Sequence, residues 1–223
     1  MLDDPAPVPE PGSAADVRRT WDARADHYLG LFRDELDGKP FDREALRAFA
    51  GRVGPGGRVY DAGCGPCGHV TALLAAHGLD VLGIDLSPRC VALARREKPD
   101  CRFVVMDQRD VAGAGERLDG LVSSYSLHDQ PKRQLATTLA AWAAALRPGG
   151  QLLIVAKEGV ADGVADDPLG SDLRVYWAEF TAYELRSAAG RAGFCVDDCA
   201  VREAYDDEIP TRRVHLAATR GAA

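Results

Sequence analysis

The feature that most constrains the fold is a glycine-rich loop between a strand-like run and a helix-like run. The stretch VYDAGCGPCGHVTALL, residues 59–74, contains G-x-G-x-x-G at Gly63, Gly65 and Gly68. Glycine lacks a Cβ, so the backbone of such a loop can approach a nucleotide-bearing ligand closely. Asp61, however, is an acid at a position where a diphosphate would be repelled. The loop therefore predicts a ligand site and leaves NAD, a different nucleotide and a metal as possible occupants.

Seven strand-like runs follow one another along the chain, and most of them are separated by helix-like segments. Strands joined through helices require right-handed crossovers, and hence a mainly parallel sheet with helices on both faces. The last two runs have no helix between them, so they must pair antiparallel. We expect an α/β, doubly wound, mainly parallel seven-stranded sheet with an antiparallel C-terminal strand. The expected strands cover residues 58–62, 80–84, 102–106, 120–124, 151–156, 194–202 and 212–219.

Apolar residues at helical spacing predict N-terminal helical additions over 14–36 and 42–52, the second capped by Asp42. After a polar insertion, helical stretches are expected up to Phe180 and again over 181–192. We divide the chain into a disordered, proline-rich leader (1–13) and one domain (14–223). That domain comprises N-terminal helices (14–56), a cofactor-binding half (57–157), an insertion or lid (158–180), and a C-terminal helix and strand pair (181–223).

Composition limits the partners and the location. A chain of 223 residues is long enough for one ordinary α/β domain. The formal net charge of −7 argues against nucleic acid as a partner, because nucleic-acid binders carry a basic field. No run approaches the apolar length of a membrane span, and the acidic, proline-rich start does not resemble a secretory signal. We therefore expect a cytoplasmic monomer or homodimer without a membrane partner.

Six cysteines raise a metal or redox alternative. Cys64-x-x-Cys67 has the spacing of a zinc or thiol-redox pair, and Cys195-x-x-x-Cys199 is a conceivable second half. The second spacing is poor for a zinc knuckle, and no histidine stands close to it. A disulfide framework is unexpected in a cytosolic chain. We therefore expect no metal site and interpret the cysteines as small apolar residues.

Four acidic or polar residues stand where predicted strands end, at Asp61, Asp85, Asp107 and Ser124. Each of them alone is equally consistent with a helix cap or a turn residue. In an open α/β sheet, however, ligands bind outside the carboxyl ends of the strands. Their joint position beside the glycine loop therefore predicts a binding site at that edge.

These residues resemble a known family. DAGCGPCG at 61–68, followed by Asp85, is similar to motif I and the post-I acid of class I (Rossmann-like) S-adenosylmethionine-dependent methyltransferases of the small-molecule type. LRPGG at 146–150, FTAYELRSAAGRAGF at 180–194 and TWDARADHY at 20–28 resemble further family segments, so the likeness spans nearly everything from residue 20 onward. The cofactor is cationic and lacks phosphate, which makes an acid in the loop intelligible.

The resemblance implies S-adenosyl-L-methionine as the cofactor and S-adenosyl-L-homocysteine as the product. Asp85 would accept hydrogen bonds from the ribose hydroxyls, Asp107 and Gln108 would face the adenine, and Tyr28 would close over the methionine carboxylate. An NAD(P)-dependent oxidoreductase and a non-catalytic S-adenosylmethionine-binding protein remain the alternatives. The expected cofactor-binding residues are Tyr28, Asp61, Gly63, Cys64, Gly65, Asp85, Leu86, Asp107, Gln108 and Ser124.

Methyl transfer is an in-line displacement, so catalysis can rest on proximity and orientation, while a hydroxyl acceptor gains from a general base. The candidate base is His128 in SYSLHDQP, where relatives often show LHH. Asp129 takes the place of the second histidine and is expected to orient or charge-tune His128. Cofactor orientation and plain loop packing are the other interpretations of His128. A small organic acceptor, in a setting of secondary metabolism, is expected to contact Trp21, Tyr125, Tyr176 and Trp177.

Overall fold

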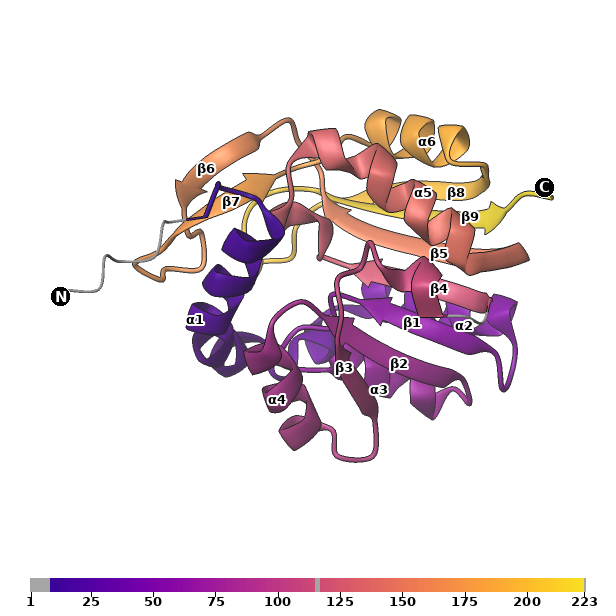
Figure 1. Cartoon of the computed structure of the whole chain (residues 1–223), viewed down its shortest axis with the longest axis horizontal. Coiled ribbons are helices and arrows are strands. Elements are labelled where there is room, and N and C mark those ends of the chain that lie inside the picture. The colour runs from indigo at the N-terminus through magenta and orange to yellow at the C-terminus, as the bar shows by residue number, and fades with distance from the viewer. Residues whose placement is uncertain (1–8, 115–116, 223) are drawn as a thin grey trace, which may run out of the picture.

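The computed structural model describes residues 9–114 and 117–222 and is built around one seven-stranded sheet (Figure 1). The strand order is β3-β2-β1-β4-β5-β9-β8, with parallel pairing from β3 to β5. Only β9 runs against its neighbours β5 and β8 among these strands. The predicted fold class is confirmed. The strands are β1 Arg58–Ala62, β2 Asp80–Asp85, β3 Arg102–Val105, β4 Leu118–Ser124, β5 Leu146–Lys157, β8 Phe194–Arg202 and β9 Arg213–Arg220.

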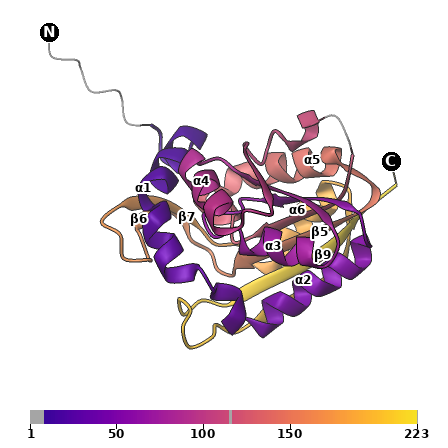
Figure 2. The same cartoon turned by 90° about the horizontal axis from the view of Figure 1, so that it is seen from below.

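Helices cover both faces of the sheet, and α1 (Ala14–Phe32) lies across the carboxyl ends of its strands. The apolar side chains of α2 and α3 pack on one face, and those of α5 and α6 pack on the other. The first helix, α1, packs against α4 and lies near the small β6–β7 hairpin (Figure 2). The α-helices are α1 Ala14–Phe32, α2 Pro40–Val53, α3 His69–Ala76, α4 Pro88–Glu97, α5 Leu135–Ala145 and α6 Ala182–Arg191, and the short 3-10 turns are Glu35–Gly38, Val111–Ala114, Leu127–Asp129 and Lys132–Gln134.

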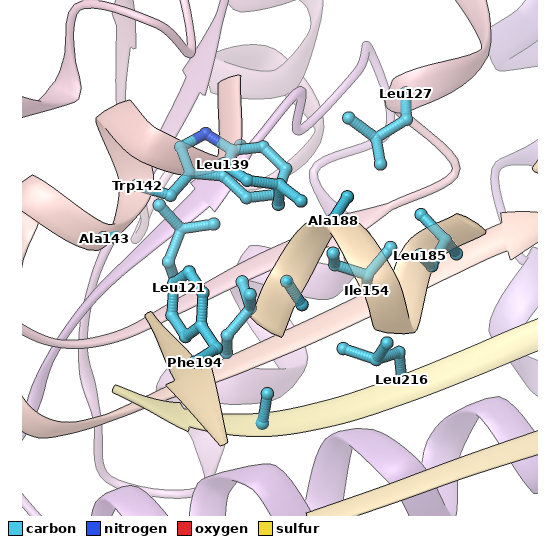
Figure 3. Packing of buried hydrophobic residues seen from close by; sticks show 14 of the residues in the cluster. Leu121, Leu127, Leu139, Trp142, Ala143, Ile154, Leu185, Ala188, Phe194 and Leu216 are labelled. Atoms are coloured by element: carbon cyan, nitrogen blue, oxygen red, sulfur yellow. The ribbon is translucent and has the colours of Figure 1, made fainter. Parts of the chain in front are cut away.

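The larger part of the core lies between the sheet and helices α5 and α6 (Figure 3). Leu121 of β4 and Ile154 of β5 face Trp142 of α5 and Leu185 of α6, and all four side chains are fully buried. The indole Nε1 of Trp142 donates a hydrogen bond to the carbonyl oxygen of Gln108 at 3.0 Å. This bond ties the core to the loop after β3, where adenine contacts are expected.

The segment before α6 differs from the prediction. Helical stretches were expected up to Phe180, but β6 (Asp162–Asp166) and β7 (Arg174–Ala178) form a separate antiparallel hairpin. The sequence RVYWA of β7 is rich in β-branched and aromatic residues, which favour an extended pleated backbone. The expected helix over 181–192 is confirmed and begins with a capping box between Thr181 and Glu184.

The start of α2 also differs from the prediction. The helix begins at Pro40, with Lys39 at the N-cap position and no side-chain cap. Asp42 is therefore not a cap; it is fully buried, and its carboxylate accepts hydrogen bonds from Tyr125 and Arg202. Residues 1–8 of the expected leader lie outside the described residues. Gly12 is described and packs closely against Pro131 and Tyr176.

Leu121→Ala is expected to lower the free energy of unfolding by about 2–5 kcal/mol, because it opens a cavity among fully buried side chains. Leu31→Ala is the matched control, since Leu31 is 55% exposed, and its effect should stay within about 0.5 kcal/mol. Urea titration followed by circular dichroism measures both values. Equal effects of the two substitutions would contradict this packing.

Candidate active site

A cavity opens at the carboxyl ends of β1, β2 and β4, and α1 forms one of its walls. The structure brings all the predicted cofactor residues together there, although their roles toward a cofactor stay predictions. Residues that sequence reasoning did not assign to the cofactor, such as Glu35, His69 and Gln130, also line it. The predicted residues in its wall are Tyr28, Asp61, Gly63, Cys64, Gly65, Asp85, Leu86, Asp107, Gln108 and Ser124.

The glycine loop is held against β2 by its own backbone. The amides of Gly63 and Cys64 both donate to the carbonyl oxygen of Ile84, at 2.8 and 3.0 Å. Gly63 and Gly65 have φ angles of +75° and +62°, in the left-handed region that favours glycine. A Cβ at Gly65 would meet no other atom and would extend into open space. The loop therefore presents bare backbone to the cavity, as the sequence predicts.

Asp85, the last residue of β2, is locked by two backbone amides. Gly65 N donates to one carboxylate oxygen at 3.0 Å and Ser87 N to the other at 2.8 Å. Burial raises the pKa of Asp85 to about 6, although both amide hydrogen bonds act in the opposite direction. A carboxylate oriented in this way can accept hydrogen bonds from a vicinal diol at the same edge of the sheet.

Asp61 is the second acid of the cavity and is 1% exposed. Thr71 Oγ1 donates to its carboxylate at 2.6 Å. Burial raises the pKa of Asp61 to about 7, and the nearby charge of Asp85 adds to the rise. Neither acid has an ion-pair partner among the residues in 9–114 and 117–222 for which the structure shows ion pairs. A cationic ligand group placed here would therefore be attracted strongly, whereas a diphosphate would be repelled.

The loop after β3 supplies the far end of the cavity. Arg109 forms two hydrogen bonds to the carboxylate of Asp107, at 3.0 and 2.6 Å. Burial would raise the pKa of Asp107, but the Arg109 bonds outweigh it and hold that pKa below its ordinary value. The side-chain oxygen of Gln108 is buried and accepts no hydrogen bond within the described part of the chain. An exocyclic amine such as that of adenine would satisfy this oxygen, so the residues present fit the predicted cofactor.

A second cavity adjoins the first and shares Trp21, Tyr28, Glu35, Tyr125 and Asp129 with it. Three of the four residues predicted to contact the acceptor line this second cavity, namely Trp21, Tyr125 and Trp177.

Tyr176, the fourth predicted residue, is absent from the walls of both cavities. Successive side chains of a strand point to opposite faces, so Tyr176 and its neighbour Trp177 cannot both face the cavity. Tyr176 instead donates a hydrogen bond to Asp162 at 2.7 Å.

The geometry does not support His128 as a general base. Its Nδ1 lies 2.8 Å from the carbonyl oxygen of Ala178, to which it must donate, and its Nε2 accepts from the amide of Lys157 at 3.1 Å. Burial lowers the pKa of His128 to about 3, with help from the charge of Lys157. The imidazole is therefore neutral, and both of its ring nitrogens are hydrogen-bonded within the protein. The ring also stacks on Trp177 at a centroid distance of 5.5 Å. Loop packing, one of the alternative interpretations, describes it better.

Asp129 does not orient His128 either. Its carboxylate accepts from Arg24 Nη2 at 2.6 Å and from Trp21 Nε1 at 3.1 Å. Arg24 is itself buried and reaches Asp167 at 3.5 Å. Asp129 therefore holds α1 over the two cavities, and Arg24 extends the link toward the hairpin. These contacts give Asp129 a structural role in place of the expected catalytic one. We call the link from Asp129 through Arg24 to Asp167 the clasp.

Sequence reasoning missed the charged side chains of the second cavity, Lys39, Lys157, Glu208 and Arg213. Lys39 Nζ pairs with Glu35 and lies 2.8 Å from Glu208, which also lies 3.6 Å from Arg213. Lys157 ends β5, at the same edge as the predicted acids, so the strand-end rule contained a signal for it. Lys39 and Glu208 stand in turns that no motif marks.

Comparisons with known proteins agree with this geometry. A family profile described as a methyltransferase domain matches residues 59–150. An uncharacterized methyltransferase of Synechocystis sp. is 28% identical over 149 residues, covering 65% of this chain and 69% of that protein. A demethylmenaquinone methyltransferase of Beutenbergia cavernae is 34% identical over 146 residues, covering 64% of this chain and 55% of that protein. The matched segment thus spans only about half of the second relative.

Among solved structures, a 1,6-didemethyltoxoflavin-N1-methyltransferase of Burkholderia thailandensis superposes with a TM-score of 0.73 at 26% identity. The match covers 98% of this chain and 94% of that one, which contains bound 1,6-didemethyltoxoflavin and S-adenosylhomocysteine. Together with the fold and the cavity, these matches support a class I S-adenosylmethionine-dependent methyltransferase. The S-adenosylhomocysteine bound in that neighbour agrees with the acidic, glycine-lined first cavity of this chain and favours S-adenosylmethionine over NAD(P) as the cofactor.

The remaining sequence alternatives concern the thiols. Cys64 and Cys67 of this methyltransferase are buried and belong to different packing clusters, one with Phe103 and one with Leu29. Burial raises the pKa of Cys67 to about 12, which keeps the thiol protonated. Within the described ranges no group of three or more ligand-type side chains is placed to hold a metal ion. No described helix combines the length and apolarity of a membrane span.

Asp61→Asn is expected to stabilise the ligand-free methyltransferase above pH about 7. The carboxyl has an ordinary pKa of 3.8 and a pKa of about 7 when buried, so the unfolded chain loses this proton first. The contribution of Asp61 to stability is therefore complete below pH 3.8 and is lost as pH rises to about 7. Thermal melting across this range should show the Asp61→Asn variant gaining over wild type as pH rises.

The same variant should bind S-adenosylhomocysteine about 10- to 100-fold more weakly, because an amide replaces a charged hydrogen-bond acceptor. Isothermal titration calorimetry above pH about 7, where the wild-type acid ionises, measures this loss. Unchanged affinity together with an unchanged pH profile of melting would remove Asp61 from the cofactor site.

Proposed function

We propose that this methyltransferase carries a methyl group from S-adenosylmethionine in the first cavity to a small organic acceptor in the second. The observation that carries the proposal is the shared wall of the two cavities, formed by Trp21, Tyr28, Glu35, Tyr125 and Asp129. A methyl donor in the first cavity and an acceptor in the second would meet at this shared wall. Holding the two reactants close together and in line supplies much of the rate acceleration in a displacement reaction.

The bound cofactor would supply the electrophilic methyl group on a sulfonium. The protein would orient the two reactants and exclude water from the space between them. Asp61 and Asp85 would hold the ammonium and the ribose hydroxyls respectively. Tyr125 has a φ of +56°, rare for a residue with a side chain, and it faces both cavities. Its hydroxyl donates to Asp42 at 2.8 Å, which fixes the ring in place. Trp21 and Tyr28 pack edge to face, at 5.1 Å between ring centroids, and shield the same space from water.

The aromatic lining favours a small organic acceptor. Two of the proteins named above are methyltransferases of demethylmenaquinone and of 1,6-didemethyltoxoflavin, both small molecules, which supports the same class of acceptor here. A role in secondary metabolism is part of the proposal. The acidic net charge of −7 supports an acceptor other than nucleic acid.

A cytoplasmic location and a monomeric or homodimeric state also belong to the proposal. All six cysteines are free thiols, and three of them are buried. Free thiols suit a reducing compartment, because oxidising compartments favour disulfides.

Asp85→Asn is expected to weaken S-adenosylhomocysteine binding by about 10- to 100-fold and to reduce methyl transfer accordingly, since one of the two accepting oxygens becomes an NH2 donor. Asp80→Asn is the matched control, because Asp80 begins the same strand at the opposite edge and pairs with Arg102. It should leave binding unchanged. Calorimetry measures the binding of both variants.

Methyl transfer itself is tested with isotope-labelled S-adenosylmethionine, a panel of phenols, enols, carboxylic acids and heteroaromatic amines, and mass spectrometry of the products. Labelled product that disappears in the Asp85→Asn variant supports the proposal. Tight S-adenosylhomocysteine binding without any labelled product would favour a non-catalytic cofactor-binding protein.

A further inference from the structure

Most cations of the second cavity are already neutralised. Lys39 pairs with Glu35 and Glu208, and Arg213 pairs with Glu208. Arg24 pairs with Asp129 and Asp167. Lys157 differs, because no carboxylate lies within ion-pairing distance of its ammonium group in the part of the chain that the structure describes.

The position of Lys157 is fixed from two sides. Its backbone amide donates to Nε2 of His128 at 3.1 Å, so the end of β5 is anchored to the loop after β4. Its Nζ lies 4.0 Å from the ring centroid of Trp177, on the hairpin strand β7. Trp177 in turn stacks on the buried ring of His128, with 18° between the planes. The amine is therefore held at the face of a fixed aromatic wall in the second cavity.

The surroundings weaken the charged form of this amine. Burial lowers the pKa of Lys157 to about 7, and the nearby cation Arg213 acts in the same direction. Lys39 also lowers this pKa, while Asp129 and Glu35 raise it from the side of the shared wall. Both the neutral amine and the ammonium are therefore present near neutral pH. A cation lacking a partner carboxylate in a desolvated cavity gains stability when an anionic ligand group replaces the missing partner.

We propose that Lys157 binds the acidic hydroxyl of a planar phenolic or enolic acceptor and takes up its proton. This inference rests on the proposed function, because it assigns the acceptor of the same methyl transfer. Trp177 and Tyr125 line the same cavity and supply aromatic carbon atoms for contact with the ring of such an acceptor.

The chemistry balances without a further reactant. The acceptor O–H bond breaks, its proton joins Nζ, and the amine becomes an ammonium paired with the oxyanion. An electron pair of the oxyanion then forms the O–CH3 bond while the CH3–S bond breaks and its electron pair stays on sulfur. The products are a neutral methyl ether and S-adenosylhomocysteine, and the ammonium returns its proton to solvent.

The test uses 4-nitrophenol, whose phenolate absorbs visible light, in the presence of S-adenosylhomocysteine. Wild-type protein should bind it with its apparent pKa lowered, seen as phenolate absorbance at a pH where the free probe is mainly protonated. Lys157→Met should bind it about 10- to 100-fold more weakly and should lose that absorbance. The uncharged analogue 4-nitroanisole should bind both proteins equally.

Lys132→Met is the matched control. Lys132 also lies over an aromatic ring, that of Phe180 at 5.7 Å, but it is paired with Glu184 and lines neither cavity. This variant should behave as wild type. Absence of nitrophenol binding, or equal binding and equal phenolate absorbance in the Lys157→Met protein, overturns the role of Lys157.

Separate titration of each protein with S-adenosylhomocysteine distinguishes the two possible failures. Normal cofactor binding with no effect of Lys157→Met on the probe refutes the acceptor inference alone. Failure of the wild-type protein to bind S-adenosylhomocysteine refutes the proposed function itself. Circular dichroism of each variant confirms that a lost signal does not come from unfolding.

Discussion

The burial of two carboxylates at one end of the sheet, neither with an ion-pair partner in the described part of the chain, is the constraint on which the rest of the site depends. Asp61 and Asp85 lose most of their hydration there, and hydroxyl or amide donors replace only part of it. Such burial is unfavourable for the free chain and becomes favourable when a cation and a diol enter. The buried, oriented carboxylates of Asp61 and Asp85 therefore favour a ligand that carries a cation and a diol.

The second cavity differs from the first in containing one cation that lacks an ion-pairing carboxylate among the described residues. Lys157 has no carboxylate within ion-pairing distance in the described part of the chain, whereas Lys39, Arg24 and Arg213 are paired. The clasp from Asp129 through Arg24 to Asp167 holds α1 above both cavities. A cationic donor beside Asp61 and Asp85 and an acidic acceptor beside Lys157 would meet at the wall that includes Tyr28 and Tyr125. Methyl transfer between them neutralises both charges, which a dry cavity favours.

Much of this could be predicted from the sequence, because the decisive signals were local. The glycine loop, Asp85 after a buried run, and Gln108 after the next run all lie at strand ends, and parallel strands bring those ends together. The acceptor side depended on contacts between distant residues. The bond from Lys157 N to His128, the clasp of Arg24 and the face chosen by Trp177 over Tyr176 are set by tertiary packing. A histidine beside an acid in the sequence therefore suggested a catalytic pair that the fold separates.

The most direct test of the central claim is a crystal structure of the protein with S-adenosylhomocysteine. We expect the amino group of the ligand within hydrogen-bonding distance of the Asp61 carboxylate. The ribose hydroxyls should lie on Asp85, and the adenine amine at the side-chain oxygen of Gln108. A ligand bound elsewhere, or bound in this cavity with its carboxylate against Asp61, would contradict the account.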